Sequence, residues 1–281
     1  MNSPTYFTLR YAAHALLLGV TTSLHAGFVD FNNAGDFTSN FTVLNGNVVE
    51  DATGGIGGTR AAKASATTDF TIINGTALSS SVGQPVVASI AFKTTVPGVN
   101  DSQTHFTTAI AGFSTLANSV STLDGAVTGQ GYYKTSSSPD IAVQGTGIPS
   151  IGLSGYGSGF TLTANSWYKL ESKFTKESTA YTWTYEVNLY SLGASGTGSP
   201  SLVGGSSYQY TFGSGQNAQD FYNATTLYPY YSFASGVDNG GLTTIDNASF
   251  TAVPEPAVTA PIVGLAMLGF GAWRRRRWNH S

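Results

Sequence analysis

The sequence contains no cysteine among its 281 residues and only four histidines. The lack of cysteine excludes disulfide scaffolds, thiolate zinc sites, iron–sulfur clusters and cysteine nucleophiles. Three of the histidines lie near the ends of the chain, which leaves His105 as the histidine of the body. Zinc sites built from several histidines are therefore excluded. A serine hydrolase would also need a G-x-S-x-G motif, and the sequence has none.

Charged residues are scarce, at 10% of the chain, whereas glycine is abundant, with 34 residues. The low charge excludes a long solvated helix or coiled coil, and the aromatic content of 12% argues against a wholly disordered chain. Residues 27–252 carry seven basic and fourteen acidic side chains. This acidic balance is unfavourable for contact with phosphate backbones, so we expect no binding of nucleic acid.

Residues 1–26 have the pattern of a secretory signal peptide. Arg10 is followed by the mostly apolar stretch 11–20, and small residues lead up to Ala26. The apolar stretch is too short to span a bilayer, which takes about 20 apolar residues. We therefore predict a signal helix, export of the chain and cleavage after Ala26.

Residues 253–281 combine three features in a fixed order. The first is a motif made of Pro254, Glu255 and Pro256. The uncharged stretch 257–273 follows, and the last feature is a basic cluster made of Arg274, Arg275, Arg276 and Arg277. As a helix, the apolar stretch would reach about 25 Å, which is a short membrane span. The arginines would hold that end in the cytoplasm, so we predict a C-terminal transmembrane helix with the body outside.

The order of these three features resembles the PEP-CTERM sorting signal of Gram-negative bacteria. The resemblance implies that an integral-membrane exosortase recognises the tail and that the chain is cut near the Pro-Glu-Pro motif. It also implies export across the inner membrane, a transient membrane anchor and a final place at the cell surface or outside the cell. Such proteins accompany exopolysaccharide production in biofilms or flocs. Exosortase, the secretion machinery and exopolysaccharide are therefore the expected partners.

Residues 27–252 predict one extracellular, all-β domain, a single large antiparallel β-sandwich. Short alternating runs are separated by Gly, Asn, Ser and Pro clusters, as in sandwiches. The clearest runs, 167–174 and 181–190, flank a polar turn and predict a hairpin. The other predicted strands are 28–31, 37–43, 69–73, 86–94, 105–113, 131–134, 160–163, 207–212, 228–233 and 242–250. We predict surface loops at 114–128, 136–159 and 192–206, and one helical turn at 217–224.

Three short stretches of this body resemble the concanavalin-like and carbohydrate-binding jelly rolls. They are 28–32 (FVDFN), 167–170 (WYKL) and 245–250 (IDNASF). The resemblance implies that the first and last strands pair, which would bring Asp30 near Asp246. It also implies that Asp246 helps to hold a structural calcium ion.

The Asp and Asn residues at the two ends of the body also favour a calcium site, independently of the resemblance. The ion takes six to eight oxygen ligands, and both ends of the body are rich in Asp and Asn. We therefore name Asp30 and Asp246 as candidate calcium ligands. The alternative, that these side chains only cap turns, stays open.

The acidic residues do not predict catalysis. A glycoside hydrolase needs two carboxyl groups about 5 to 10 Å apart, which on one strand face means positions i and i+2. The sequence has no such pair, so we name no catalytic residue. A pair assembled across strands from Glu171 and Glu186 stays open.

Tyrosine offers a different chemistry, because its ring stacks on a sugar face while its hydroxyl forms hydrogen bonds. We name Tyr228, Tyr230 and Tyr231 as candidate glycan contacts. The alternative, that they pack in the core, stays open.

Three classes of function follow from these features. The first is a non-catalytic surface or matrix protein that is sorted by exosortase and binds exopolysaccharide. The second is a glycan-active enzyme on a concanavalin-like scaffold. The third is an adhesin or structural coat protein with no small ligand.

Overall fold

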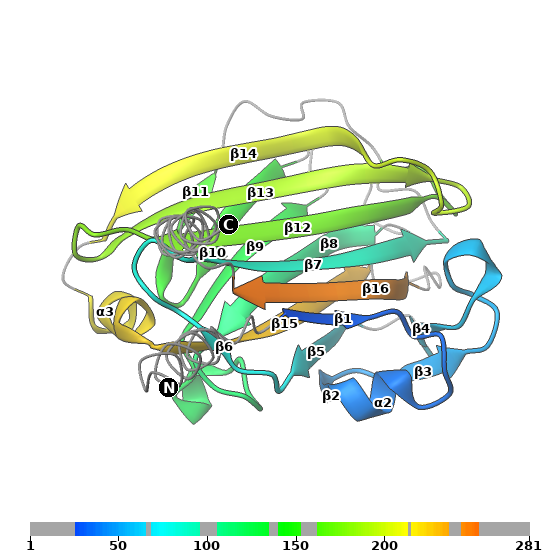
Figure 1. The fold of residues 1–281 in the computed structure, drawn as a ribbon, viewed down its shortest axis with the longest axis horizontal. Helices are drawn as coiled ribbons and strands as arrows, with labels where there is room; N and C mark the ends of the chain where they lie inside the picture. The colour runs from blue at the N-terminus through cyan, green and yellow to red at the C-terminus, as the bar shows by residue number, and fades with distance from the viewer. Residues whose placement is uncertain are drawn as a thin grey trace, which may run out of the picture. The chain divides into compact units, whose positions relative to one another are not determined.

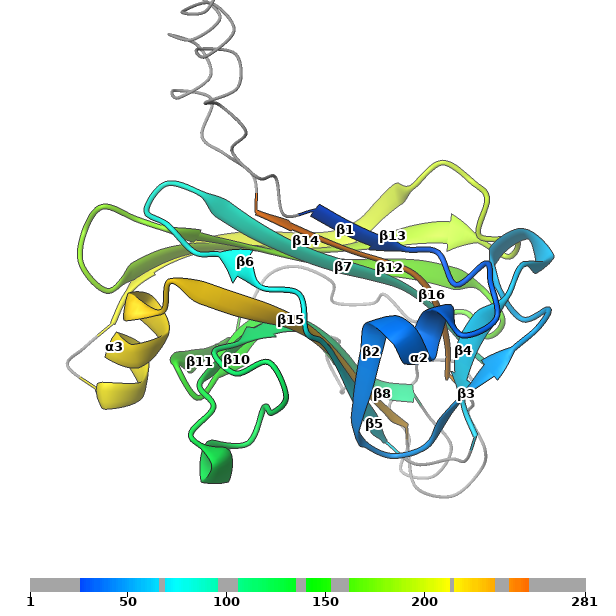
Figure 2. The same ribbon diagram turned by 60° about the horizontal axis from the view of Figure 1, so that its bottom comes forward.

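The computed structural model describes residues 26–65, 69–95, 106–134, 140–152, 162–212, 215–235 and 243–252. Antiparallel strands in two eight-stranded sheets make up most of these residues. Figure 2 shows the sheets as two layers, seen nearly edge-on. The all-β class that the sequence predicted is confirmed, because the described helices are few and short.

The first sheet, which we call sheet A, contains the first and the last described strand. Its order is β14 (Ser201–Thr211), β13 (Thr182–Gly193), β12 (Trp167–Lys176), β7 (Pro85–Thr94), β16 (Thr243–Ala252), β4 (Ala61–Ala64) and β3 (Val48–Asp51). β1 (Ala26–Val29) pairs with β16 beside β4 (Figure 1). The predicted pairing of the first and last strands is thus confirmed.

The second sheet, sheet B, lies behind sheet A in Figure 1. Its order is β11 (Ile148–Gly152), β10 (Asp140–Gly145), β9 (Thr128–Lys134), β8 (Phe106–Ser114), β15 (Thr226–Ser235), β5 (Phe70–Asn74) and β2 (Phe41–Asn45). The two-residue strand β6 (Leu78–Ser79) pairs with β15. The helical segments among the described residues are α2 (Asp36–Asn40), α3 (Gln216–Asn223) and the 3₁₀ turns η1 (Ile56–Gly58) and η2 (Thr122–Asp124).

The predicted hairpin is confirmed as β12 and β13. Leu170 lies opposite Leu189, and Phe174 lies opposite Tyr185. Along both strands nearly every second residue is buried, which is the period-two pattern of a strand with one face on the core. The predicted helical turn is confirmed as α3, which covers two turns.

The predicted strand 37–43 is wrong in its first half. α2 begins after Gly35, whose φ of 87° lies in the left-handed region. The carboxylate of Glu50 accepts hydrogen bonds from the backbone N–H groups of Gly35 at 2.9 Å and Phe37 at 3.3 Å. A distant acidic side chain therefore satisfies the start of this helix, and β2 begins only at Phe41.

Three strands occupy segments that the sequence predicted as loops. β10 and β11 lie within 136–159, and β14 begins inside 192–206. β14 and β11 are the edge strands of their sheets. An edge strand buries little, so its composition does not need the β-branched and aromatic residues that mark a central strand.

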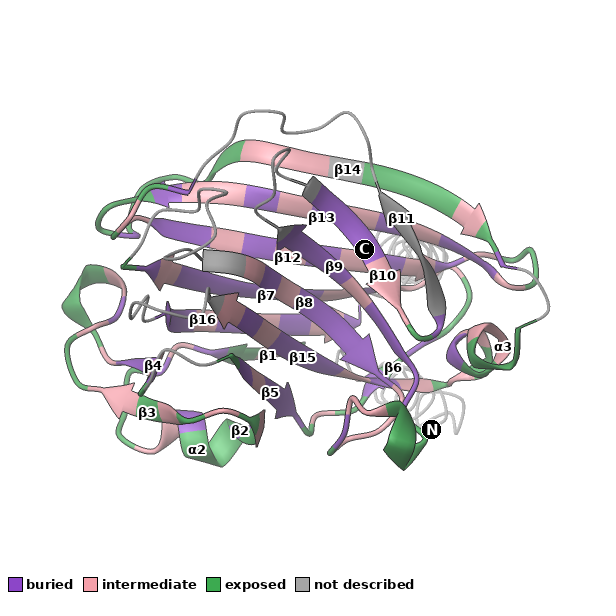
Figure 3. Cartoon of the chain, turned by 180° about the vertical axis from the view of Figure 1, so that it is seen from behind, coloured by how far each residue is buried: buried purple, intermediate pink, exposed green. Residues whose placement is uncertain are grey.

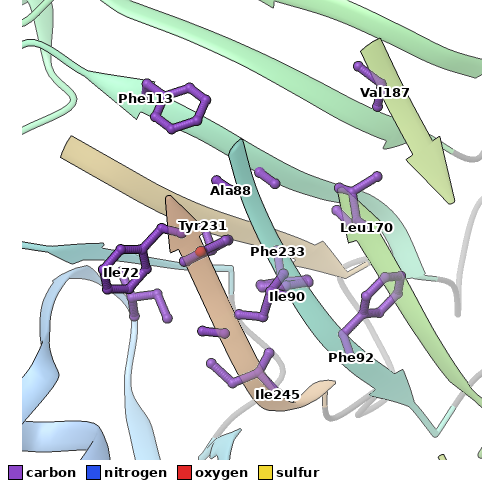
Figure 4. Packing of buried hydrophobic residues seen from close by; sticks show 14 of the residues in the cluster. Ile72, Ala88, Ile90, Phe92, Phe113, Leu170, Val187, Tyr231, Phe233 and Ile245 are labelled. Atoms are coloured by element: carbon purple, nitrogen blue, oxygen red, sulfur yellow. The ribbon is translucent and has the colours of Figure 1, made fainter. Parts of the chain in front are cut away.

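The core lies between the two sheets and is rich in aromatic rings. Phe113 of β8 meets Phe174 of β12 with ring centroids 5.3 Å apart, and Phe92 of β7 meets Phe233 of β15 at 5.5 Å. Figure 4 shows part of the buried cluster, in which Ile72, Ile90, Leu170 and Val187 take part together with Phe92, Phe113 and Phe233. Burial of this apolar surface is the main force that holds the two layers together.

The predicted signal helix and transmembrane helix lie outside the described residues. So do the sorting motif of Pro254, Glu255 and Pro256 and the cluster from Arg274 to Arg277. Ala26 is the first described residue and begins β1. In the part of the chain that the structure describes, no helix has the length and apolar character of a membrane span.

Candidate functional site

Each sheet has an outer face, which we define as the face that points away from the other sheet. The outer face of sheet A carries charges. The Nζ atom of Lys169 lies 3.0 Å from Oε2 of Glu171, and the Nζ atom of Lys173 lies 2.8 Å from Oε1 of Glu186. The ammonium of Lys169 also lies 4.5 Å from the ring centroid of Tyr190. This face therefore presents a network of ion pairs to solvent.

Glu171 and Glu186 do lie on the same face of neighbouring strands, as the hydrolase alternative requires. Lys173 is directly opposite Glu186 in the register of β12 and β13. Each carboxylate is in an ion pair, and the two side chains are 27% and 35% exposed. A catalytic pair needs one carboxyl group in an apolar site that keeps it protonated. The surroundings of these two residues do not provide such a site.

The outer face of sheet B is different in character, and Figure 3 looks onto it. Its direction is fixed by Gly131 in β9, where a Cβ atom would lie 2.5 Å from Cγ2 of Val187 in sheet A. The neighbouring residues Gln130 and Tyr132 must therefore point outward. The described side chains at the centre of this face are uncharged. They include Thr71, Ile73, Ile110, Gln130, Tyr132, Tyr228, Tyr230 and Ser232.

Tyr230 and Gln130 are joined across the strand between them. Tyr230 lies opposite Gly112, and Gly112 lies opposite Gln130. The Tyr230 hydroxyl donates a hydrogen bond to Oε1 of Gln130. Glycine is required between them, because a Cβ atom at Gly112 would lie 2.6 Å from the Cβ of Gln130. This row of three residues, which we call the Tyr–Gly–Gln row, fixes the orientation of the Gln130 amide.

The electrostatics of this row favour a neutral ligand. Tyr230 is buried, and its burial raises the pKa of its hydroxyl well above the ordinary value, so the hydroxyl stays protonated. Gln130 is half-buried, and its Oε1 atom is occupied by Tyr230. The Nε2 atom of Gln130 carries two further N–H donors, and no described residue accepts a hydrogen bond from them. These donors are the groups of the row that we consider for contact with a ligand.

A second polar pair lies beside the row. The hydroxyls of Thr71 in β5 and Ser232 in β15 lie 2.9 Å apart, and Ser232 is directly opposite Ile110. Tyr228, two residues before Tyr230 on the same strand face, is half-buried. Hydroxyl, amide and aromatic groups are thus gathered at the centre of this face, where the described side chains are uncharged.

The three tyrosines named from the sequence therefore have different places. Tyr228 and Tyr230 belong to the outer face of sheet B, but the ring of Tyr230 is largely covered, with 3% of its surface exposed. Tyr231 points into the core, and its hydroxyl donates to the carbonyl oxygen of Ser249 in sheet A at 3.1 Å. Glycan contact by Tyr231 is wrong in this structure, because a fully buried ring offers no face to a ligand.

The two candidate calcium ligands do come close together. β1 and β16 pair with Val29 opposite Ala248, which places Asp30 beside the end of the β16 bulge at Asn247. Asp30 accepts hydrogen bonds from the backbone and the side chain of Asn32, the latter at 2.7 Å. Asp246 is 1% exposed. The sequence thus predicted this proximity correctly.

Both carboxylate oxygens of Asp246 are occupied by protein donors. Oδ2 accepts a hydrogen bond from the backbone N–H of Ile56 at 2.9 Å, and Oδ1 accepts one from Asn247 at 2.7 Å. Burial, the largest cause, and the charge of Asp30 raise the pKa of Asp246 to about 6, against the opposing effect of these hydrogen bonds. Asp246 therefore anchors the glycine-rich segment around η1 to β16.

The residues around Asp246 do not fit a calcium ion as they are arranged. Calcium takes six to eight oxygen ligands, whereas no group of three or more acidic or histidine side chains in the described residues is arranged to hold a metal. Asp238 and Asn239, two further oxygen-bearing residues near the C-terminal end of the body, lie outside the described residues. No sequence pattern indicates the hydrogen bond between Ile56 and Asp246, because 190 residues separate them.

No protein-family model matches the sequence, and no curated protein matches it. Solved structures are similar in fold, and among them are legume lectins, which have a concanavalin-like jelly-roll fold. Lectin I from Ulex europaeus, solved with the methyl glycoside of α-L-fucose, is 9% identical with a TM-score of 0.51, over 83% of this chain and 99% of that chain. Basic winged bean lectin, solved with Tn-antigen, is 10% identical with a TM-score of 0.50, over 82% and 99%. At such identities the likeness establishes the fold alone.

Proposed function

We propose that this chain is an exported, non-catalytic carbohydrate-binding protein and that its glycan contacts the outer face of sheet B. The observation that carries the proposal is the Tyr–Gly–Gln row among the uncharged described side chains at the centre of this face. The Nε2 donors of Gln130 and the hydroxyls of Thr71 and Ser232 are suited to sugar hydroxyls. The half-buried ring of Tyr228 offers an apolar surface for the face of a sugar.

The lack of charge on this face points to a neutral glycan. A charged sugar would need an opposite charge to replace its hydration, and the centre of this face offers none among its described side chains. The fold supports the same class of ligand, because the two lectins named above were solved with a fucoside and with Tn-antigen.

The ends of the sequence support a proposal for where this binding takes place. The signal peptide ending at Ala26 and the tail with Pro254, Glu255 and Pro256 are consistent with export and sorting by exosortase. We therefore propose exopolysaccharide of the biofilm or floc as the glycan. The membrane is then a temporary partner, through residues 257–273.

A glycan screen tests the proposal. Full-length protein, purified in mild detergent because of its apolar tail, is applied to an array of neutral and acidic glycans, and the hits are measured by calorimetry. Binding to neutral glycans is expected. Gln130→Glu keeps the acceptor for Tyr230 and removes the amide donors, so it should weaken binding about tenfold. The same exchange in the turn before β7, Gln84→Glu, serves as the control.

Two outcomes would contradict the proposal. Absence of binding to any glycan at millimolar concentration would favour the coat-protein alternative. Equal loss of binding in the Gln130 and Gln84 variants would show that the outer face of sheet B is not the contact surface. Melting curves of both variants establish that each is folded.

A further inference from the structure

Among the described strands, β14 is an edge strand whose own residues give it no protection against pairing. It forms the end of sheet A and pairs only with β13 among the described strands. Along its eleven residues there is no charged residue and no proline, and these are the residues by which proteins protect an open edge. Leu202 is 59% exposed and Tyr208 is 39% exposed. Half of the backbone N–H and C=O groups of such a strand point away from the sheet.

The other edges of the two sheets are short or protected. β3, at the opposite end of sheet A, has four residues, and its two acidic residues form ion pairs with Arg60 and Lys63. β1 also has four residues. In sheet B, β11 has five residues and contains Pro149, and β2 has five residues. Among the edge strands of the described part of the chain, β14 is therefore the one that is both long and uncharged (Figure 1).

The regular part of β14 begins after a bulge. The register with β13 shifts between Leu189 and Tyr190, which lie opposite Gly204 and Leu202, so Val203 is the extra residue. Residues 204–210 then read GGSSYQY. The first half of this stretch is made of the smallest side chains, and the second half is made of large ones.

This asymmetry makes the strand complementary to a second copy of itself. If two β14 strands run antiparallel with Ser207 on the two-fold axis, Tyr210 faces Gly204 of the other copy. In the same register Gln209 faces Gly205, and Tyr208 faces Ser206. Every large side chain therefore lies opposite a small one, and no like charges are brought together. The row of Tyr230 and Gly112 in sheet B is a similar pairing of tyrosine with glycine within this chain.

We propose that two copies of this protein associate through β14, antiparallel about a two-fold axis at Ser207, so that the two sheets A become one continuous sheet. The axis makes the assembly a closed dimer, and the short or protected opposite edges of the sheets disfavour further growth into a filament. The outer face of sheet B, where we place the glycan, is not part of this interface. The dimer would thus carry two glycan-binding faces.

The mass of the full-length protein in mild detergent tests this inference, with light scattering used to subtract the detergent. The expected mass is that of two chains. Ser207→Lys places two ammonium groups beside the axis and should reduce the mass to one chain. Ser201→Lys adds the same charge at an exposed position outside the paired stretch and should leave two chains. A single chain in the unchanged protein at tens of micromolar would overturn the inference.

Because the chain has no cysteine, single cysteines test the register without background. In the proposed dimer the two Cα atoms at position 207 lie about 5 Å apart, within disulfide range. Ser207→Cys should therefore form a covalent dimer on mild oxidation. Thr211→Cys should not, because its counterpart lies about 27 Å along the strand. Equal crosslinking of both variants, or a dimer that Ser207→Lys leaves intact, would overturn the proposal.

Discussion

The hydroxyl of Tyr230 reaches the amide of Gln130 across Gly112, a residue with no side chain. The tyrosine ring can lie across β8 only because Gly112 has no side chain to occupy the same space. In the same arrangement a buried hydroxyl gains a partner, which such a group requires, and the orientation of the Gln130 amide is fixed. One glycine thus connects the packing of sheet B with the site that we propose.

Gly112→Ala should lower the free energy of unfolding by about 1–3 kcal/mol, which is typical of overpacking. The added Cβ would lie 2.6 Å from the Cβ of Gln130 and 2.8 Å from the carbonyl oxygen of Gly129. Gly75→Ala is the matched control, because nothing lies within 4 Å of a Cβ there. Urea denaturation of both variants measures the difference. Equal stability of the two would mean that sheet B does not pack closely at Gly112.

Asp246 should make stability depend on pH between about 4 and 6. Its folded-state pKa is raised to about 6 from 3.8, so the folded state holds the proton more tightly than the unfolded state. The stabilisation is fully present below about pH 4 and is lost as the pH rises through 6, a change of about 2–3 kcal/mol. Asp246→Asn should remove this dependence in melting curves recorded at each pH.

Melting curves of the unchanged protein and of Asp246→Asn also test the prediction that Asp30 and Asp246 bind calcium. If added calcium raises the melting temperature of the unchanged protein above pH 6 and not that of Asp246→Asn, then Asp30 and Asp246 bind the ion with ligands outside the described residues. If calcium and EDTA give identical curves, Asp246 serves to anchor the backbone of Ile56 to β16. A pH-independent stability from 4 to 7 would contradict the raised pKa.

Lys176 should make the free energy of unfolding rise with pH in the alkaline range, which is opposite to the effect of Asp246. Its Nζ atom is buried, donates to the carbonyl oxygens of Ala224 and Ser80, and lies 5.6 Å from the ring centroid of Trp183. Burial lowers its pKa from 10.5 to about 8. The unfolded state therefore binds more protons between these values, and stability should rise with pH by about 2–3 kcal/mol.

Lys176→Met should abolish this rise, because it replaces the ammonium with an apolar chain of similar length. Denaturant titrations at pH 7.5, 9 and 10.5 test the difference between the two proteins. The same rise in the variant would assign the effect to other groups, and no rise in either would show that the ammonium is solvated in the folded protein.

The mature surface protein should lack residues 257–281, because Pro254, Glu255 and Pro256 precede a short anchor and a basic stop. Intact-mass analysis of protein extracted from the cell surface tests this. Recovery of the complete C-terminus would leave a plain membrane anchor as the interpretation of the tail.

Strand-forming patterns were readable in the sequence where one face of a strand is buried. β12 and β13 alternate along nearly their whole length because one side of each packs on the core. β11 and the first half of β14 were missed because edge strands that contain glycine, serine or proline resemble loops. β10, which lies between β9 and β11, was missed because the segments on both sides of it are rich in glycine, serine and threonine. α2 was missed because its start depends on Glu50, a residue from another part of the chain.

The candidate site could be predicted only in part, because the contacts that form it join residues far apart in the sequence. The resemblance to the jelly rolls implied the proximity of Asp30 and Asp246, because the first and last strands of those folds pair, and the pairing of β1 with β16 confirms it. A tyrosine motif, by contrast, cannot tell which of two adjacent residues faces outward without the register. Tyr230 and Tyr231 are neighbours in sequence and lie on opposite faces of β15. Gln130 was missed entirely, because its partner is 100 residues away.

Hydrogen–deuterium exchange with and without the bound glycan tests the central claim most directly, because it locates the contact on the full-length protein. We predict slower exchange in β8, β9 and β15, the strands that carry Gly112, Gln130 and Tyr230, and no change in β12 and β13. Protection confined to β12 and β13, where the outer face of sheet A carries its ion pairs, would contradict the account.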